Sequence, residues 1–85
     1  MSDEIRAQVK TFLLDTFLPG ENPDELTDQT PLISGGILDS IATLKLVMFL
    51  EERFKIGLEA HEADREHLDT LADIATLVRT KLAQG

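Results

Sequence analysis

The sequence predicts an all-α fold: a small bundle of three main helices and one short helix, with a long loop between the first two helices. Two observations predict this fold class. Apolar residues recur at helical spacing in three segments, and no segment alternates apolar and polar residues as a strand does. The 85 residues match the size of one domain, which we expect to span residues 1–85.

The first helix is expected from Ser2 to about Leu18, where Pro19-Gly20 ends it. One face of this helix carries the apolar residues Ile5, Val9, Phe12 and Leu13. A loop follows from Pro19 to Leu38, and loops of this length in compact domains are usually functional or disordered. We expect this loop to lie on the core, because it carries the apolar residues Leu26, Leu32, Ile33, Ile37 and Leu38.

The second helix is expected from about Ser40 to Phe54 and has two apolar stripes. The stripe predicted to face the core comprises Leu46, Val47, Leu50 and Phe54. Its predicted neighbours are Ile5, Val9 and Phe12 of the first helix and Ile74 and Val78 of the last. The outer stripe lies well over ~100° away and comprises Ile41, Leu44 and Met48. Periodicity leaves two possibilities open: the short helix covers the outer stripe, or partners bind it.

The remaining two helices follow a stretch of polar residues. A short, weakly patterned third helix is expected within Ala60 to His67. The last helix begins near Thr70, where Thr70 and Asp73 have the spacing of a capping box. Its apolar face comprises Leu71, Ile74, Ala75, Val78 and Leu82.

Composition argues against several functions. The chain has 16 acidic and 8 basic residues, a net charge of −8, and no basic residue between Thr11 and Leu44. Such a surface repels nucleic-acid phosphates and anionic membranes and favours basic partners. Without cysteine, the chain has no thiol nucleophile and no disulfide. It also lacks a membrane-length apolar run and a signal-peptide pattern, so we expect a cytoplasmic protein without membrane insertion. We also expect the protein to be a monomer.

Asp39-Ser40 stands at the start of the second predicted helix, after Gly35-Gly36. An Asp-Ser pair before an apolar helix is first of all a helix cap. The position also has chemical meaning, because unpaired N–H groups and the positive end of the helix dipole favour a phosphate there. An exposed serine at this point could carry a phosphodiester, and the glycines would let a modifying enzyme approach closely.

The stretch from Gly36 to Phe54, GILDSIATLKLVMFLEERF, resembles the modification site and second helix of acyl and peptidyl carrier proteins. The resemblance implies that Ser40, with Asp39 as its motif neighbour, receives 4′-phosphopantetheine from coenzyme A through a Mg²⁺-dependent phosphopantetheinyl transferase. The thiol of that arm would hold an acyl or aminoacyl group as a thioester. Such a carrier needs no catalytic group and no protein-bound metal. It passes its cargo from a loading ligase to a downstream acyltransferase or synthase, and the residues expected to dock these enzymes are Ile41, Leu44, Lys45 and Met48.

Departures from the family pattern bear on the subclass. The fatty-acid branch usually has acidic residues on the exposed face of this helix, where this chain has Ala42 and Lys45. Ile41-Ala42-Thr43 and the stretch from Asp64 to Thr70 look closer to D-alanyl carriers and other stand-alone carriers of aminoacyl groups. Ala63 and Leu68, however, replace the aromatic residues usual in that branch. We therefore expect a specialised carrier, and the sequence does not name its cargo.

The residues allow three other interpretations. The main alternative is an acidic helical protein-interaction module that is never modified, in which Asp39-Ser40 is only a cap. A hydrolase using Ser40 with His61 or His67 has little support, since the nucleophile-elbow motif is missing. A calcium site in the acidic loop is equally weak, because its acidic residues lack the spacing of an EF-hand. Those residues are Asp24, Glu25 and Asp28.

Overall fold

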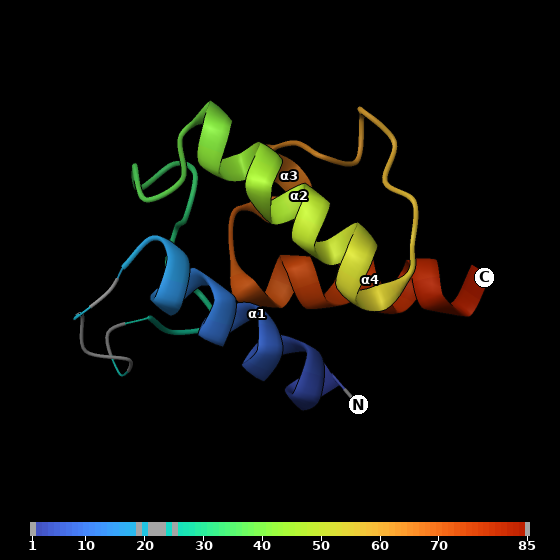
Figure 1. The fold of residues 1–85 in the computed structure, drawn as a ribbon, viewed down its shortest axis with the longest axis horizontal. Helices are drawn as coiled ribbons and strands as arrows, with labels where there is room; N and C mark the ends of the chain where they lie inside the picture. Colours follow the sequence, from blue (N-terminus) through green and yellow to red (C-terminus); the bar gives the residue numbers. More distant parts are fainter. Residues whose placement is uncertain (1, 19, 21–23, 25, 85) are drawn as a thin grey trace.

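The computed structural model describes residues 2–18, 20, 24 and 26–84, and all of its regular structure there is helical. The four helices are α1 (Ser2–Thr16), α2 (Ser40–Phe54), α3 (Arg65–Leu68) and α4 (Leu71–Gln84). The predicted all-α fold, with three main helices and one short helix, is confirmed (Figure 1). No helix in the described part is both long and apolar enough to span a membrane.

The core lies between α1, α2 and α4, and the long loop and α3 close it. In Figure 1, α2 runs across the upper side of the molecule, while α1 and α4 form its lower side. α4 contacts each of the other three helices. The helical core residues are Ile5, Val9, Leu13, Ala42, Leu46, Val47, Leu50, Leu68, Leu71, Ile74, Ala75, Leu77 and Val78. The loop adds Leu26, Leu32 and Leu38, so the prediction that this loop packs on the core is confirmed.

Two of the predicted core residues are only partly buried against the core, and a third is exposed. Phe12 and Phe54 are only partly buried, because they belong to a cluster of aromatic rings at the edge of the core. The ring of Phe12 stacks on that of Phe49 with 4.1 Å between centroids, and Phe54 meets Phe49 edge-on at 6.4 Å. Leu82, predicted on the apolar face of α4, is 45% exposed. Figure 1 shows the C-terminal end of α4 extending past the other helices.

Two helix boundaries differ from prediction. α1 ends at Thr16, and the N–H groups of Phe17 and Leu18 both donate to the Leu13 carbonyl, so the chain leaves the helix through a wider, π-type turn. The third helix spans Arg65–Leu68 and so ends one residue beyond the predicted bounds of Ala60 to His67. Asp64 caps it and accepts the His67 N–H at 3.2 Å. The other helix starts and ends agree with the sequence to within a residue or two.

Two polar contacts hold the connection between α2 and α3 against the bundle. The Glu51 carboxylate in α2 accepts the Leu58 N–H at 2.9 Å. Further along, Glu62 pairs with Lys81 of α4 at 2.8 Å, and both side chains are less than one-fifth exposed. These contacts keep residues 58–64 close to the bundle, and two of them, Ala63 and Asp64, line the groove described below.

Candidate functional site

Ser40 is the first residue of α2, and its side chain is exposed. Asp39 precedes it in an extended conformation and caps the helix: its carboxylate accepts the Ala42 N–H at 2.7 Å. The Asp39 carbonyl accepts both the N–H and the hydroxyl of Thr43, at 2.9 and 2.7 Å. The predicted cap is therefore confirmed, and it leaves the Ser40 hydroxyl at the solvent-facing start of the helix.

The turn before this cap requires both of its glycines. Gly36 has a φ of 83°, a conformation that side chains rarely adopt. A Cβ atom on Gly35 would lie 2.2 Å from the Pro31 carbonyl oxygen. The sequence predicts that these glycines let a modifying enzyme approach closely. The structure shows a further requirement, because the backbone could not make this turn with larger residues.

A groove of about 500 Å³ lies beside Ser40. It is bounded by the loop, the first turn of α2 and the segment before α3. Its apolar lining consists of Ile33, Leu38 and Ala63, and its polar lining consists of Asp39, Ser40, Thr43 and Asp64. The exposed hydroxyl therefore opens onto a shallow depression with room for a small flexible group.

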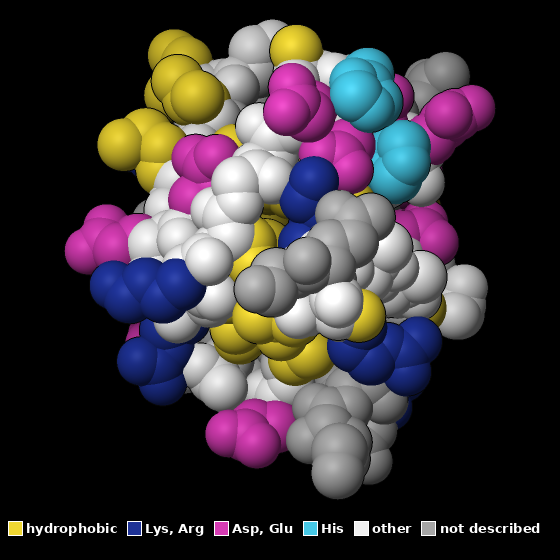
Figure 2. All heavy atoms as spheres, turned by 90° about the vertical axis from the view of Figure 1, so that its right-hand side faces the viewer, with side chains coloured by type: hydrophobic (Ala, Val, Ile, Leu, Met, Phe, Trp, Pro, Cys, Tyr) yellow, Lys and Arg dark blue, Asp and Glu magenta, His cyan; other side chains and the backbone are white. Residues whose placement is uncertain are grey.

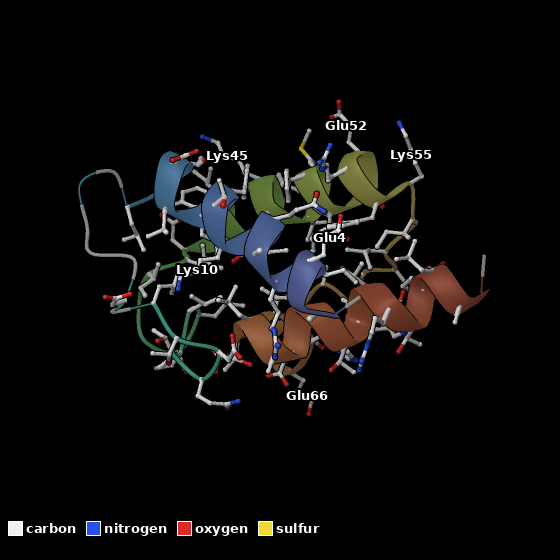
Figure 3. The ribbon with its side chains drawn as sticks, turned by 90° about the horizontal axis from the view of Figure 1, so that it is seen from below. Glu4, Lys10, Lys45, Glu52, Lys55 and Glu66 are labelled. Carbon is white, nitrogen blue, oxygen red and sulfur yellow. The ribbon has the colours of Figure 1, made fainter. Side chains whose placement is uncertain are left out.

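The outer stripe of α2 is not covered by α3. Ile41, Leu44 and Met48 are 67%, 59% and 58% exposed. These values exclude the possibility that the short helix covers the outer stripe. Lys45 is also exposed. Figure 3 shows it projecting outward from α2, as Glu52 does nearer the end of the same helix. The helix therefore buries one stripe and presents the other to solvent.

The two histidines do not form a catalytic group with Ser40. They lie among carboxylates on the face shown in Figure 2, and neither is among the described residues that line the groove. His67 Nδ1 lies 2.8 Å from the Asp64 carboxylate. This hydrogen bond raises the pKa of His67 and lowers the pKa of Asp64. The geometry gives the hydrolase interpretation no support.

The acidic loop also gives no support to a calcium site. Asp28 pairs with Arg6 of α1 at 3.0 Å, and Glu25 lies outside the described residues. Within the described part, the one cluster of three potential metal ligands is Asp64, Glu66 and His67. The His67–Asp64 hydrogen bond and the cap of α3 account for two of its members.

Sequence reasoning missed Asp69, which joins the start of α4 to the loop before Ser40. Its carboxylate accepts hydrogen bonds from Ile33 and Ser34, which lie 36 and 35 positions away in the sequence. The sequence places Asp69 beside Thr70, whose hydroxyl accepts the Asp73 N–H at 3.1 Å as predicted for a cap. Nothing in the sequence around Asp69 indicates that its carboxylate has partners in the distant loop.

Comparison with known proteins agrees with this geometry. A family model described as "Phosphopantetheine attachment site" matches residues 18–78. The acyl carrier protein of Thermotoga maritima is 30% identical over 80 residues, which cover 94% of each chain. That of Chlamydia caviae is 30% identical over 73 residues, 86% of this chain and 90% of the relative. The lincomycin biosynthesis protein LmbN of Streptomyces lincolnensis is 41% identical over 66 residues, 78% of this chain but 24% of LmbN.

The chain therefore belongs to the phosphopantetheine-binding carrier family, as the sequence resemblance implied. It is an acyl-carrier-type protein rather than an enzyme, and its cofactor is covalently attached 4′-phosphopantetheine. Carriers of this family work with a phosphopantetheinyl transferase and with biosynthetic enzymes. The described residues fit such an arm, since an exposed hydroxyl at a helix start opens onto a groove of suitable size.

Proposed function

We propose that Ser40 carries the arm and that residues 1–85 act as one carrier domain, which passes an acyl or aminoacyl group between enzymes. The observation that carries this proposal is the exposed Ser40 hydroxyl, which the Asp39 cap holds at the first turn of α2. The arm supplies the thiol that the chain lacks and holds the cargo as a thioester.

The surroundings of Ser40 suit a phosphodiester. The start of α2 presents the positive end of the helix dipole, which offsets the charge of a phosphate. The Asp39 carboxylate is hydrogen-bonded to the Ala42 N–H, so its own charge is partly neutralised by the helix. Ile33, Leu38 and Ala63 offer apolar contacts to the part of the arm next to the phosphate.

We also propose that the outer stripe of α2, together with Lys45, docks the enzymes that act on the arm. Three exposed apolar side chains on one helix face form a compact patch next to Ser40, and such patches usually mark binding. Met48 adds a flexible contact that adapts to several partners. Excess negative charge on the rest of the chain speeds encounters with basic enzymes.

The cargo is proposed to be that of a specialised carrier, closer to the aminoacyl and D-alanyl type than to the main fatty-acid type. This rests on Lys45, which is exposed where the fatty-acid branch usually has an acid. Ala42, which was expected on the same exposed face, is instead buried in the core. The partners would be a loading ligase and a downstream acyltransferase or synthase in the cytoplasm, with the carrier itself a monomer. Loading assays that offer both fatty acids and amino acids to candidate ligases distinguish the two subclasses.

Substitution of Ser40 tests the attachment site. Incubation with coenzyme A, Mg²⁺ and a broad-specificity phosphopantetheinyl transferase should add one arm to the wild-type chain, measured by intact-mass spectrometry. Ser40→Ala should abolish the addition and keep the helical circular-dichroism spectrum. Thr43→Ala is the matched control, because Thr43 carries the other hydroxyl among the described residues that line the groove. If Ser40→Ala still gains the arm, the assignment is wrong; if the wild type gains none, the unmodified interaction module is favoured.

A further inference from the structure

Asp69 lies between α3 and α4 and accepts hydrogen bonds from three consecutive residues of the long loop. Its Oδ1 accepts the N–H groups of Ile33 and Ser34, both at 2.9 Å. Its Oδ2 accepts the Ser34 hydroxyl at 2.7 Å, and its backbone carbonyl accepts the Leu32 N–H at 2.6 Å. Hydrogen bonds to a charged acceptor are the stronger kind, so this residue holds the loop at several points at once.

Asp69 is held in place by buried residues on both sides of it. The residues on either side of the α3–α4 junction, Leu68 and Leu71, are 0% and 1% exposed. A second link lies nearby, where the Ala72 N–H donates to the Asp28 carbonyl at 3.2 Å. The position of the carboxylate is therefore fixed by the core, and the loop takes its position from the carboxylate.

The loop residues that Asp69 holds lead directly to Ser40. The Gly36 N–H donates to the Ile33 carbonyl at 3.1 Å, and the Leu38 N–H donates to the Leu32 carbonyl at 2.8 Å. The turn at residues 32–38 is thereby closed on the same residues that Asp69 fixes. Ser34, Gly35 and Gly36 are exposed, so an enzyme that reaches Ser40 meets this turn as part of the same surface.

We propose that Asp69 is a positioning residue for arm attachment: it holds the turn at residues 32–38 in the shape that the phosphopantetheinyl transferase recognises beside Ser40. The proposal rests on the proposed function of Ser40. Without the carboxylate, the N–H groups of Ile33 and Ser34 are left to water, and the exposed turn samples other shapes. If the transferase binds only one of these conformations, a smaller fraction of the carrier is competent for binding. The apparent KM of the transferase for the carrier then rises.

The test compares Asp69→Ala with Asp69→Asn and with Asp73→Ala, a control that removes an exposed carboxylate from the first turn of α4. If the competent fraction falls to about a tenth, Asp69→Ala should raise the transferase KM for the carrier roughly tenfold and leave kcat unchanged. Asp69→Asn keeps one acceptor oxygen and should recover most of the wild-type KM. Amide exchange followed by NMR should accelerate at Ile33 and Ser34 in the Ala variant while the core amides stay protected. Asp73→Ala should change none of these values.

Several results would overturn the proposal. A wild-type KM for Asp69→Ala, or unchanged exchange at Ile33 and Ser34, shows that the carboxylate does not position the turn. A fall in kcat with faster exchange throughout the core shows a general structural role instead. If the wild-type chain takes no arm, or Ser40→Ala still does, the proposed function fails and this proposal fails with it. Amide exchange at Ile33 and Ser34 can be measured on the unmodified chain. It therefore reports whether Asp69 holds the turn even if Ser40 proves not to carry the arm.

Discussion

The interaction between His67 and Asp64 depends on the protonation of both residues. The hydrogen bond to the Asp64 carboxylate raises the pKa of His67 above its ordinary 6.5. The same bond lowers the pKa of Asp64 below its ordinary 3.8. The pair therefore stabilises α3 fully between these two ordinary values. Its contribution is lost as the pH rises through the raised pKa of His67 and as it falls through the lowered pKa of Asp64.

An NMR titration of His67 tests this pairing. Asp64→Asn is the suitable variant, because asparagine also caps helices and should keep α3 in place. We expect the titration midpoint of the His67 ring to be higher in the wild type than in Asp64→Asn, since the variant removes the negative charge that favours imidazolium. Equal midpoints in two folded proteins would show that the contact at 2.8 Å does not persist in solution.

At the scale of the element, α2 buries one apolar face in the core and exposes a second, which is the face proposed to dock partner enzymes. Leu46 and Leu50 are fully buried, whereas Leu44 and Met48, each two residues away from one of them, are more than half exposed. Burial contributes roughly 1.5–3 kcal/mol for a leucine side chain, so the inner face helps to hold the fold. The outer face contributes little to folding and is free to contact partners.

A matched pair of substitutions tests this division. Leu44→Asp should leave the melting temperature nearly unchanged but slow arm attachment, because it places a charge in the proposed docking patch. Leu46→Asp should unfold much of the protein, since an unpaired charge in the core costs several kcal/mol. Thermal melts and transferase rates measure both effects. A large loss of stability in Leu44→Asp would show that the outer stripe is part of the core.

The helices were predictable because their signals are local. The spacing of apolar residues, the Asp39 and Thr70 caps and the glycines before Ser40 each act within a few residues, and the structure agrees with them. The edge position of Phe54 was not predictable, because it depends on how α1 and α2 pack their aromatic rings. The contact of Asp69 with the loop was missed for the same reason: its partners are distant in the sequence, and no period relates them.

At the scale of the whole molecule, the net charge of −8 is confined to a small volume. The radius of gyration is 11.8 Å, close to the Debye length of about 10 Å at 0.1 M salt. At low ionic strength most pairs of carboxylates therefore repel each other across the protein. Ion pairs such as Arg6–Asp28 and Lys81–Glu62 offset only part of this repulsion, since acids outnumber bases two to one.

Added sodium chloride should therefore have opposite effects on folding and on association. Screening should raise the melting temperature, by about 4–8 °C for each ~1 kcal/mol of repulsion relieved in a domain of this size. The same salt should slow encounter with a basic transferase, which stopped-flow association rates measure. A melting temperature that falls with salt would mean that the ion pairs outweigh the general repulsion.

The link between Asp69 and the loop also bears on how the protein matures during synthesis. Ile33 and Asp69 are 36 positions apart, so the ribosome releases the segment around Ser40 well before the residue that shapes it. Until Asp69 and Ala72 have emerged, this segment lacks the partners that the finished fold gives it. The loop before Ser40 thus gains these hydrogen bonds only after Asp69 has been synthesised, and a copy truncated before Asp69 cannot form them. Attachment of the arm would then follow folding, so that only finished carriers enter the pool available for loading.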